Sequence, residues 1–372
     1  MDPVRLFAIA RKEWLQLRRD RRSMILAFVL PVFMLLFFGY AISWDIDDIP
    51  LAVLDQDHSR ASRDLVETLT AGELFHVSEY IDHHGDADEP IRTGAARAVL
   101  VIPPGFQRDI AAGGPAPVQL LLDGADANTA TIALNYADAI VAQHSQAILL
   151  QGRRVQPPLQ ADSRVWYNPT LESRNMIVPS LIAVIMSIIA AMLTALTIAR
   201  EWERGTMEQL AATPVHRLEV VLGKLLPYVL IGVLDVTVAA IAGIVVFGVP
   251  FRGSVLLLGV MTLLFLAGAL GLGLFISAAL RSQVLAMQVA MVATYLPALL
   301  LSGFLFDIAS MPVVLRAVTT IVPARYFVTV TRGIFLKGVG IEVLWAQALS
   351  MVAFAALGLG LAAAAFRKQI AR

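Results

Sequence analysis

The sequence contains no cysteine, which excludes a disulfide framework, thiol catalysis and cysteine-ligated zinc. Lysine is scarce as well, occurring only at Lys12, Lys224, Lys337 and Lys368. No stretch follows the pattern G-x-x-x-x-G-K-[ST], in which main-chain amides and a lysine hold nucleotide phosphates. The 29 Lys and Arg residues are balanced by 29 Asp and Glu residues, so net charge indicates no class of partner. The sequence carries no nucleic-acid signature.

Charged residues make up only 16% of the chain, whereas hydrophobic residues make up 58%, far above the usual share in soluble domains. A helix needs about 20 apolar residues to cross the hydrocarbon core of a bilayer. Six runs qualify, at residues 23–43, 176–199, 220–248, 255–280, 284–305 and 342–366. The sequence therefore predicts an α-helical polytopic membrane protein with six transmembrane helices, the last five within residues 174–372.

Basic residues cluster in residues 1–22 and again after residue 366. Because Lys and Arg near span ends favour the cytoplasmic side, we expect both termini in the cytoplasm. The first apolar run could instead be a cleaved signal peptide, but its basic lead is long and Pro31 interrupts the run. Within residues 1–22, apolar and basic residues occupy opposite faces, which predicts an amphipathic helix in the inner interface. The apolar face holds Leu6, Ala10, Trp14 and Leu17. A plain positively charged anchor fits equally well.

Residues 44–173 form a large insertion between the first two runs, with 19 acidic residues against eight basic ones. This negative balance suits the extracytoplasmic side. Short β-type runs alternate with helical segments, which predicts an inserted α/β domain. The expected strands lie at residues 50–54, 75–81, 98–102 and 118–122, and the expected last helix at about 128–151.

A polar segment, REWERGTMEQLAATP at residues 200–214, separates the second and third apolar runs. Thr206 and Gln209 fit a capping box, in which each side chain bonds the other's main-chain amide and a new helix begins. Gly205 permits a sharp turn before that helix, and Pro214 limits the helix to two turns. A solvated loop is the alternative interpretation.

This segment closely resembles the cytoplasmic signature E-x-E-R-G-T-x-E-Q-L-x-x-T-P of ABC-2-type transporter permeases. WYNPTLESR at residues 166–174 and the stretch from Val322 to Gly338 are similar to the family's leads into its second and last spans. The large insertion further resembles the multidrug exporter branch, which has a large extracytoplasmic domain between the first two spans. The likeness covers essentially the whole chain.

The resemblance implies a permease in a bacterial cytoplasmic (inner) membrane that moves amphipathic small molecules or drugs outward. It also implies partners: a separate ABC ATPase that binds ATP and Mg²⁺, and a second permease copy or a related permease. A periplasmic membrane-fusion adaptor and membrane lipid are further candidate partners; no cofactor is expected in this chain. In the family, a short cytoplasmic coupling helix contacts the ATPase, and residues 200–214 correspond to it here. The residues that match the family signature are Glu201, Glu203, Arg204, Gly205, Thr206, Glu208, Gln209, Thr213 and Pro214.

Asp235 lies inside the third apolar run, where a carboxylate is costly and raises the hypothesis of a proton or cation relay. A hydrogen bond to a neighbouring helix is the simpler interpretation, and we favour it because one unpaired carboxylate makes a poor relay. The histidines of the insertion, including the adjacent His83 and His84, fit a solvated acidic surface better than a metal site.

Glycines at 268, 271, 273, 358 and 360 lie inside apolar runs, so they predict close helix packing. The apolar stretch 306–337, broken by Pro312 and Pro323, predicts short helices that can form a re-entrant segment and an outer gate. Two other functions compete with transport. One is a membrane-anchored sensor that binds a ligand in the inserted domain, and the other is an intramembrane enzyme with Asp235 as its base.

Overall fold

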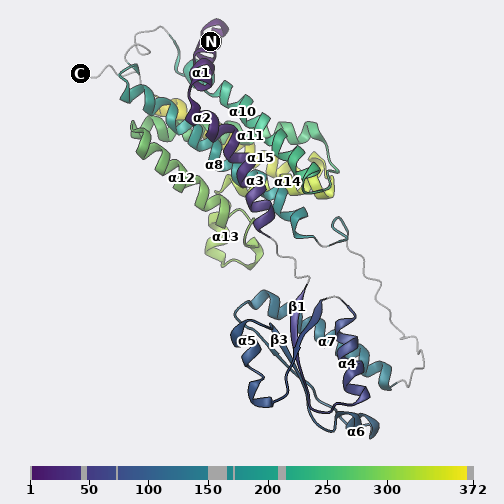
Figure 1. Cartoon of the computed structure of the whole chain (residues 1–372). Helices are drawn as coiled ribbons and strands as arrows, with labels where there is room; N and C mark the ends of the chain where they lie inside the picture. The colour runs from purple at the N-terminus through teal and green to yellow at the C-terminus, as the bar shows by residue number, and fades with distance from the viewer. Residues whose placement is uncertain are drawn as a thin grey trace. The chain divides into compact units, whose positions relative to one another are not determined.

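The computed structural model describes residues 2–42, 48–72, 74–149, 166–170, 172–207 and 215–366. The chain divides into two compact units (Figure 1). The first unit comprises Met1–Ser43 and Arg164–Arg372, and the second comprises Trp44–Ser163.

The first unit begins with helix α1, Pro3–Arg19, which the Asp2 carboxylate caps by accepting a hydrogen bond from the Val4 amide at 3.0 Å. A continuous helical stretch follows, made of α2 (Arg21–Met24), the π-helix η1 (Ile25–Val29) and α3 (Leu30–Ala41). Pro31 has no amide hydrogen for the helical ladder, and the π-turn directly before it accommodates this gap. The first predicted apolar run is therefore helical.

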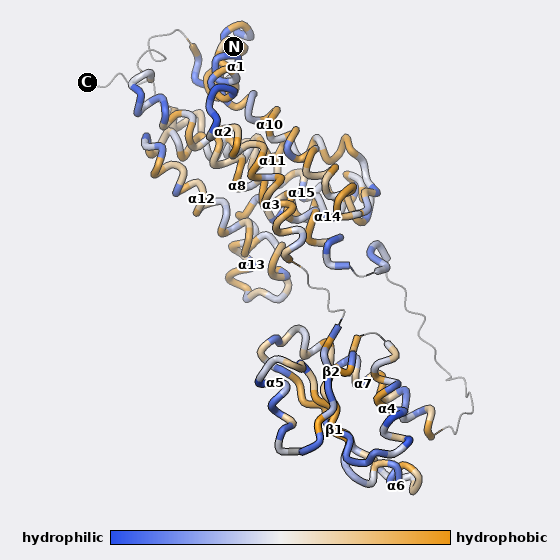
Figure 2. The backbone as a smooth tube through the Cα atoms, in the orientation of Figure 1, coloured by the Kyte–Doolittle hydropathy of each residue, from blue (hydrophilic) through white to orange (hydrophobic). Residues whose placement is uncertain are grey.

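Among the described residues, five helices are long and apolar enough to cross a membrane, or six if a bent pair counts as one span. The five match the last five predicted runs, and Figure 2 shows their hydrophobic character. They are α8 (Ser173–Glu203), α10 (Arg217–Val245), α11 (Val255–Leu280), α12 (Gln283–Leu300) and α15 (Ile341–Ala365). Helix α8 is central: 94% of its most apolar window is buried, against 22% for α12 and α15.

Glycines bring α11 into close contact with its neighbours. A Cβ atom added at Gly271 would lie 2.6 Å from the carbonyl carbon of Gly358, and one at Gly268 would overlap the ring of Phe354. Gly273 approaches Thr194 of α8 in the same way. The predicted packing role is thus confirmed for these glycines, whereas Gly360 meets nothing within 4 Å among the described residues.

The predicted breaks between residues 306 and 337 are confirmed. After η3 (Ile308–Ser310), helix α13 spans Val313–Thr319, α14 spans Pro323–Arg332, and the π-helix η4 spans Gly333–Lys337. The axes of α13 and of the combined α14 and η4 differ by 81°. Arg332 fixes this segment to α8, because its Nε atom donates to the Ser180 hydroxyl at 2.5 Å.

The second unit is an α/β domain built on a four-stranded sheet with the order β2-β1-β3-β4. Strand β1 pairs in parallel with β2 and β3, and β4 is antiparallel to β3. The strands are β1 (Ile49–Asp55), β2 (Phe75–Tyr80), β3 (Ala98–Ile102) and β4 (Gln119–Leu122), as predicted from their β-type runs.

Within the described residues of this unit, five helical segments cover the sheet. Side chains of α4 (Arg60–Thr70), α6 (Phe106–Ala111) and α7 (Ala127–Leu149) pack into one hydrophobic cluster with β1 and β3. Residues around η2 (His84–Asp86) and α5 (Glu89–Thr93) pack into a second cluster formed by the alternate residues of the same strands. The sheet is therefore covered on both faces, as expected for buried parallel strands.

Candidate functional site

Helix α8 ends inside the polar segment that carries the family resemblance. Arg200 to Glu203 form its last turn, so the helix extends beyond the predicted end at residue 199. Gly205 then takes φ of +68°, a left-handed conformation that glycine adopts without strain. The amides of Gly205 and Thr206 donate to the carbonyls of Trp202 and Glu201 at 3.1 and 3.0 Å. The predicted sharp turn at Gly205 is confirmed.

The remainder of the predicted coupling helix is largely outside the described residues. Thr206 is half-buried, and its hydroxyl donates to the Glu201 carbonyl at 3.4 Å. Glu208, Gln209, Thr213 and Pro214 lie outside the described residues, and so does the partner that the Thr206 capping box requires.

Glu201 lies at the centre of a buried charged cluster rather than on the surface. Its side chain accepts from Lys12 of α1 at 2.8 Å and from Lys224 of α10 at 3.1 Å. Lys224 also donates to Glu13 of α1 at 3.1 Å, and the Tyr228 hydroxyl donates to Glu13 at 3.3 Å. We call these five residues the junction cluster, because they join α1, α8 and α10.

The junction cluster is electrically balanced, with two carboxylates and two ammonium groups. Glu13, Glu201 and Lys224 are only 3%, 3% and 2% exposed, so each would be costly to bury alone. Losing one member of such a buried pair costs about 3–5 kcal/mol, because a charge is left without a partner. The contacts therefore hold the three helices in one arrangement.

Further contacts join the last turn of α8 to α12 and to the end of α1. Arg200 pairs with Asp20 at 2.7 Å, and its Nε atom donates to Gln283 at 3.4 Å. Glu203 accepts hydrogen bonds from the main-chain amide of Gln283, at 2.7 Å, and from its side-chain amide, so it caps the first turn of α12. Every charged residue of this last turn thus contacts another helix or the end of one.

Helix α1 packs closely against α10 at Gly223. A Cβ atom added at Gly223 would lie 2.9 Å from the Leu6 carbonyl oxygen and the Ile9 Cβ atom. Gly223 therefore allows α1 to approach α10 closely, and the neighbouring Lys224 pairs with the Glu13 carboxylate of α1.

The sequence reasoning missed Glu13 and Lys224. The buried line on α1 is Ala10, Glu13 and Leu17, whereas Trp14, assigned to the apolar face, is 42% exposed. Two features of the sequence could have indicated these residues. Glu13 lies between the apolar positions Ala10 and Leu17 of an amphipathic helix, and Lys224 lies near the start of the apolar run 220–248.

Asp235 is 5% exposed on α10, and its Oδ2 atom has no hydrogen-bond partner in the parts of the chain that the structure describes. Gly232, one turn earlier, contacts Leu266 of α11. The Thr262 hydroxyl of α11 is also buried without a hydrogen-bond partner among the described residues. Within the described ranges, no group of three or more His, Asp and Glu side chains could hold a metal ion.

Comparison with known proteins connects this geometry to a family. The sequence profile of the ABC-2 family transporter proteins matches residues 21–364. The chain is 38% identical over 359 residues to the probable multidrug ABC transporter permease YbhS of Escherichia coli strain K12, covering 96% of this chain and 95% of that protein.

Two further relatives match over similar lengths. YbhR of the same strain, also a probable multidrug ABC transporter permease, is 30% identical over 369 residues, which is 98% of this chain and 99% of the relative. The linearmycin resistance permease protein LnrN of Bacillus subtilis strain 168 is 22% identical over 383 residues, which is 95% of this chain and 97% of the relative. These matches span both the apolar helices and the inserted domain, so the chain belongs to the ABC-2 transporter family and is a multi-pass membrane permease of an ABC transporter.

Proposed function

We propose that this permease exports amphipathic small molecules or drugs, driven by a separate ATPase subunit that docks on residues 200–214. The names of the relatives support the substrate class, because two are named probable multidrug permeases and one is named a linearmycin resistance permease. The absence of a phosphate-binding loop from the sequence supports a separate source of energy. The full-length match to permeases favours transport over a sensor or a lipid enzyme.

The observation that carries the coupling mechanism is the position of Glu201 in the junction cluster, four residues before Gly205. A partner that moves the turn at Gly205 would also move the last turn of α8. The buried ion pairs to α1 and α10 resist bending at this point, so the displacement would pass to these helices as a rigid-body motion. Glu203 would carry the same displacement to α12 through Gln283.

Roles within the polar segment follow from burial. Glu201 would act inside the permease, as a residue that positions the end of α8. The exposed residues Arg204 and Gly205, with Thr206 beside them, would face the ATPase. The exposed apolar faces of α12 and α15 suit lipid or a second permease copy. The α/β unit would lie outside the cytoplasm, where it could receive substrate or dock a periplasmic adaptor.

The first prediction tests the coupling. The purified chain should hydrolyse no ATP alone, and addition of the ATPase subunit in a proteoliposome should give hydrolysis coupled to drug transport. Gly205→Pro should uncouple hydrolysis from transport or abolish docking, because proline fixes φ near −65° and removes the amide that bonds Trp202.

Gly113→Pro is a matched control. Gly113 has φ of +70°, has nothing within 4 Å, and donates its amide to the carbonyl three residues earlier, as Gly205 does. The two substitutions impose the same backbone change, but Gly113 belongs to the other unit. Normal coupled transport by Gly205→Pro would disprove transmission through this turn.

A further inference from the structure

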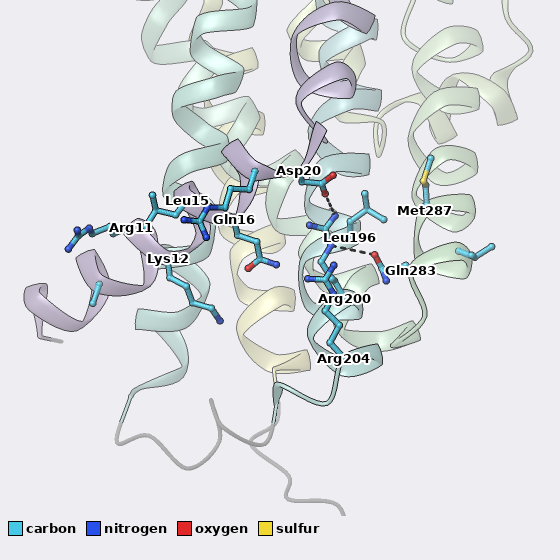
Figure 3. Close-up of a pocket in the computed structure, with 13 residues that line it drawn as sticks. Arg11, Lys12, Leu15, Gln16, Asp20, Leu196, Arg200, Arg204, Gln283 and Met287 are labelled. Atoms are coloured by element: carbon cyan, nitrogen blue, oxygen red, sulfur yellow. Dashed lines mark hydrogen bonds and ion pairs between the residues drawn. The ribbon is translucent and has the colours of Figure 1, made fainter. Parts of the chain in front are cut away.

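A large open cleft lies beside the junction cluster, between α1, α8 and α12 (Figure 3). Its volume is about 1160 Å³. Five basic side chains and one acidic side chain line the cleft, together with an apolar wall from the same three helices. We refer to it as the basic cleft, and its charged residues are Arg11, Lys12, Arg19, Asp20, Arg200 and Arg204.

Three of these cations have no carboxylate within ion-pair distance among the described residues. Lys12 pairs with Glu201, and Arg200 pairs with Asp20 at 2.7 Å. Arg11, Arg19 and Arg204 remain, and all three are exposed. Like charges repel, so a cleft lined by three such guanidinium groups is stabilised by an anion that binds between them. Guanidinium groups recognise phosphate oxygens well, because their fork of N–H donors matches two oxygens at once.

The surroundings of the basic cleft indicate that the anion is attached to a lipid. Leu15, Leu196, Val284 and Met287 supply apolar surface next to the cations. Helix α1 also exposes Val4 and Phe7, which are 75% and 67% exposed, on an otherwise basic helix. A helix of this type lies in the membrane interface, at the depth of the lipid headgroups.

We propose that the basic cleft binds one anionic phospholipid of the inner leaflet. The anionic headgroup would lie in the basic cleft, whose arginines without an ion pair among the described residues are Arg11, Arg19 and Arg204, and an acyl chain would lie along the apolar wall. Basic clefts between helices at the cytoplasmic interface suit such headgroups, since that leaflet carries negative charge. The lipid would contact both α1 and the residue before the Gly205 turn, so its binding would favour the arrangement in which α1 and α8 are joined.

Native mass spectrometry of the purified full-length chain tests the proposal, with phosphatidylglycerol and phosphatidylcholine as probes. The chain should bind phosphatidylglycerol in preference to phosphatidylcholine. The variant R11Q/R19Q should bind phosphatidylglycerol about 30-fold more weakly, because each basic residue near the surface contributes about 1 kcal/mol and 1.4 kcal/mol is tenfold.

R18Q/R21Q is the matched control, since it removes two exposed arginines from the same region that do not line the cleft. This control should retain phosphatidylglycerol affinity within about threefold. Neither variant touches the junction cluster, and a thermal-unfolding midpoint equal to that of the parent chain shows that folding is unchanged. The assay needs no ATPase, so its outcome is independent of the proposed coupling.

Four outcomes would overturn the proposal. Equal weakening in both double variants would show that surface charge alone attracts the lipid. Equal binding of phosphatidylcholine would show that the apolar wall alone is responsible. Displacement by millimolar inorganic phosphate would identify a free anion as the ligand. Lipid bound to monomers and absent from dimers would show that a second copy fills the cleft.

Discussion

Lys224 illustrates how a single buried charge can determine helix arrangement. Its ammonium group is 2% exposed and lies 3.1 Å from carboxylate oxygens of both Glu13 and Glu201. An unpaired cation in this position would have to be desolvated without compensation. The lysine is therefore stable only where both α1 and α8 supply a carboxylate, which selects one packing of these helices against α10.

The substitution Lys224→Met should lower the unfolding free energy by about 3 kcal/mol or more, since among the described residues it leaves Glu201 with Lys12 and the buried Glu13 without a cation. Methionine keeps much of the volume of the side chain, so the effect reports charge. Adding Glu13→Gln should recover part of the loss, because the number of unpaired charges falls. Chemical unfolding in detergent measures both effects.

Lys337→Met is the control for that comparison. Lys337 is exposed and follows a buried turn, so its removal should change the unfolding free energy by less than about 0.5 kcal/mol. Strictly additive losses from Lys224→Met and Glu13→Gln would show that the two side chains do not interact energetically.

Asp235 requires a different argument, because it has no counter-charge within the described residues. Its Oδ2 atom and the Thr262 hydroxyl are both buried without a hydrogen-bond partner there. A relay needs a chain of titratable groups, and a single carboxylate without a counter-charge makes a poor one.

Asp235→Asn should therefore keep expression and most drug transport, since the amide retains hydrogen-bonding capacity and removes only the titratable charge. Transport assays in vesicles at several pH values provide the measurement. Loss of transport in a variant that folds and docks its ATPase normally would favour the relay instead.

At the scale of elements, the sequence predicted regular structure better than contacts between elements. The apolar runs of α8, α10, α11, α12 and α15 and the β-type runs of the sheet each produced the expected element. These signals are local, because length and periodicity are properties of one segment. Gly205 was equally predictable, since its turn depends on its own φ angle.

The junction cluster could not be predicted in this way, because its contacts join residues up to 215 positions apart, such as Glu13 and Tyr228. Each residue alone resembles an ordinary interfacial charge, and only the packing of α1 on α10 at Gly223 brings them together. Family resemblance identified Glu201 as important, but it implied contact with a partner, whereas the structure places its side chain among helices of the same chain. The contact with the ATPase stays a prediction.

At the scale of the whole molecule, acidic and basic residues are concentrated in different parts of the chain, as is typical of membrane proteins. The α/β unit contains most of an insertion with 19 acidic and eight basic residues. The junction cluster and the basic cleft, in contrast, gather basic residues of α1 at the end of the helical unit where α8 ends and α10 begins. Since basic residues favour the cytoplasmic side, the two regions should lie on opposite sides of the membrane.

This topology can be tested directly, because the chain contains no cysteine of its own. Single cysteines at Asp82 or Asp126, which are exposed in the α/β unit, should react with an impermeant thiol reagent in intact cells with a permeable outer barrier. Cysteines at the equally exposed Arg18 or Arg217 should react only after the membrane is opened. Each substitution replaces an exposed charged side chain, so similar reactivity is expected in permeabilised cells. Labelling of Arg18→Cys from outside would show that the predicted orientation is wrong. The Gly205 turn would then lie outside the cytoplasm, where no ATPase could reach it.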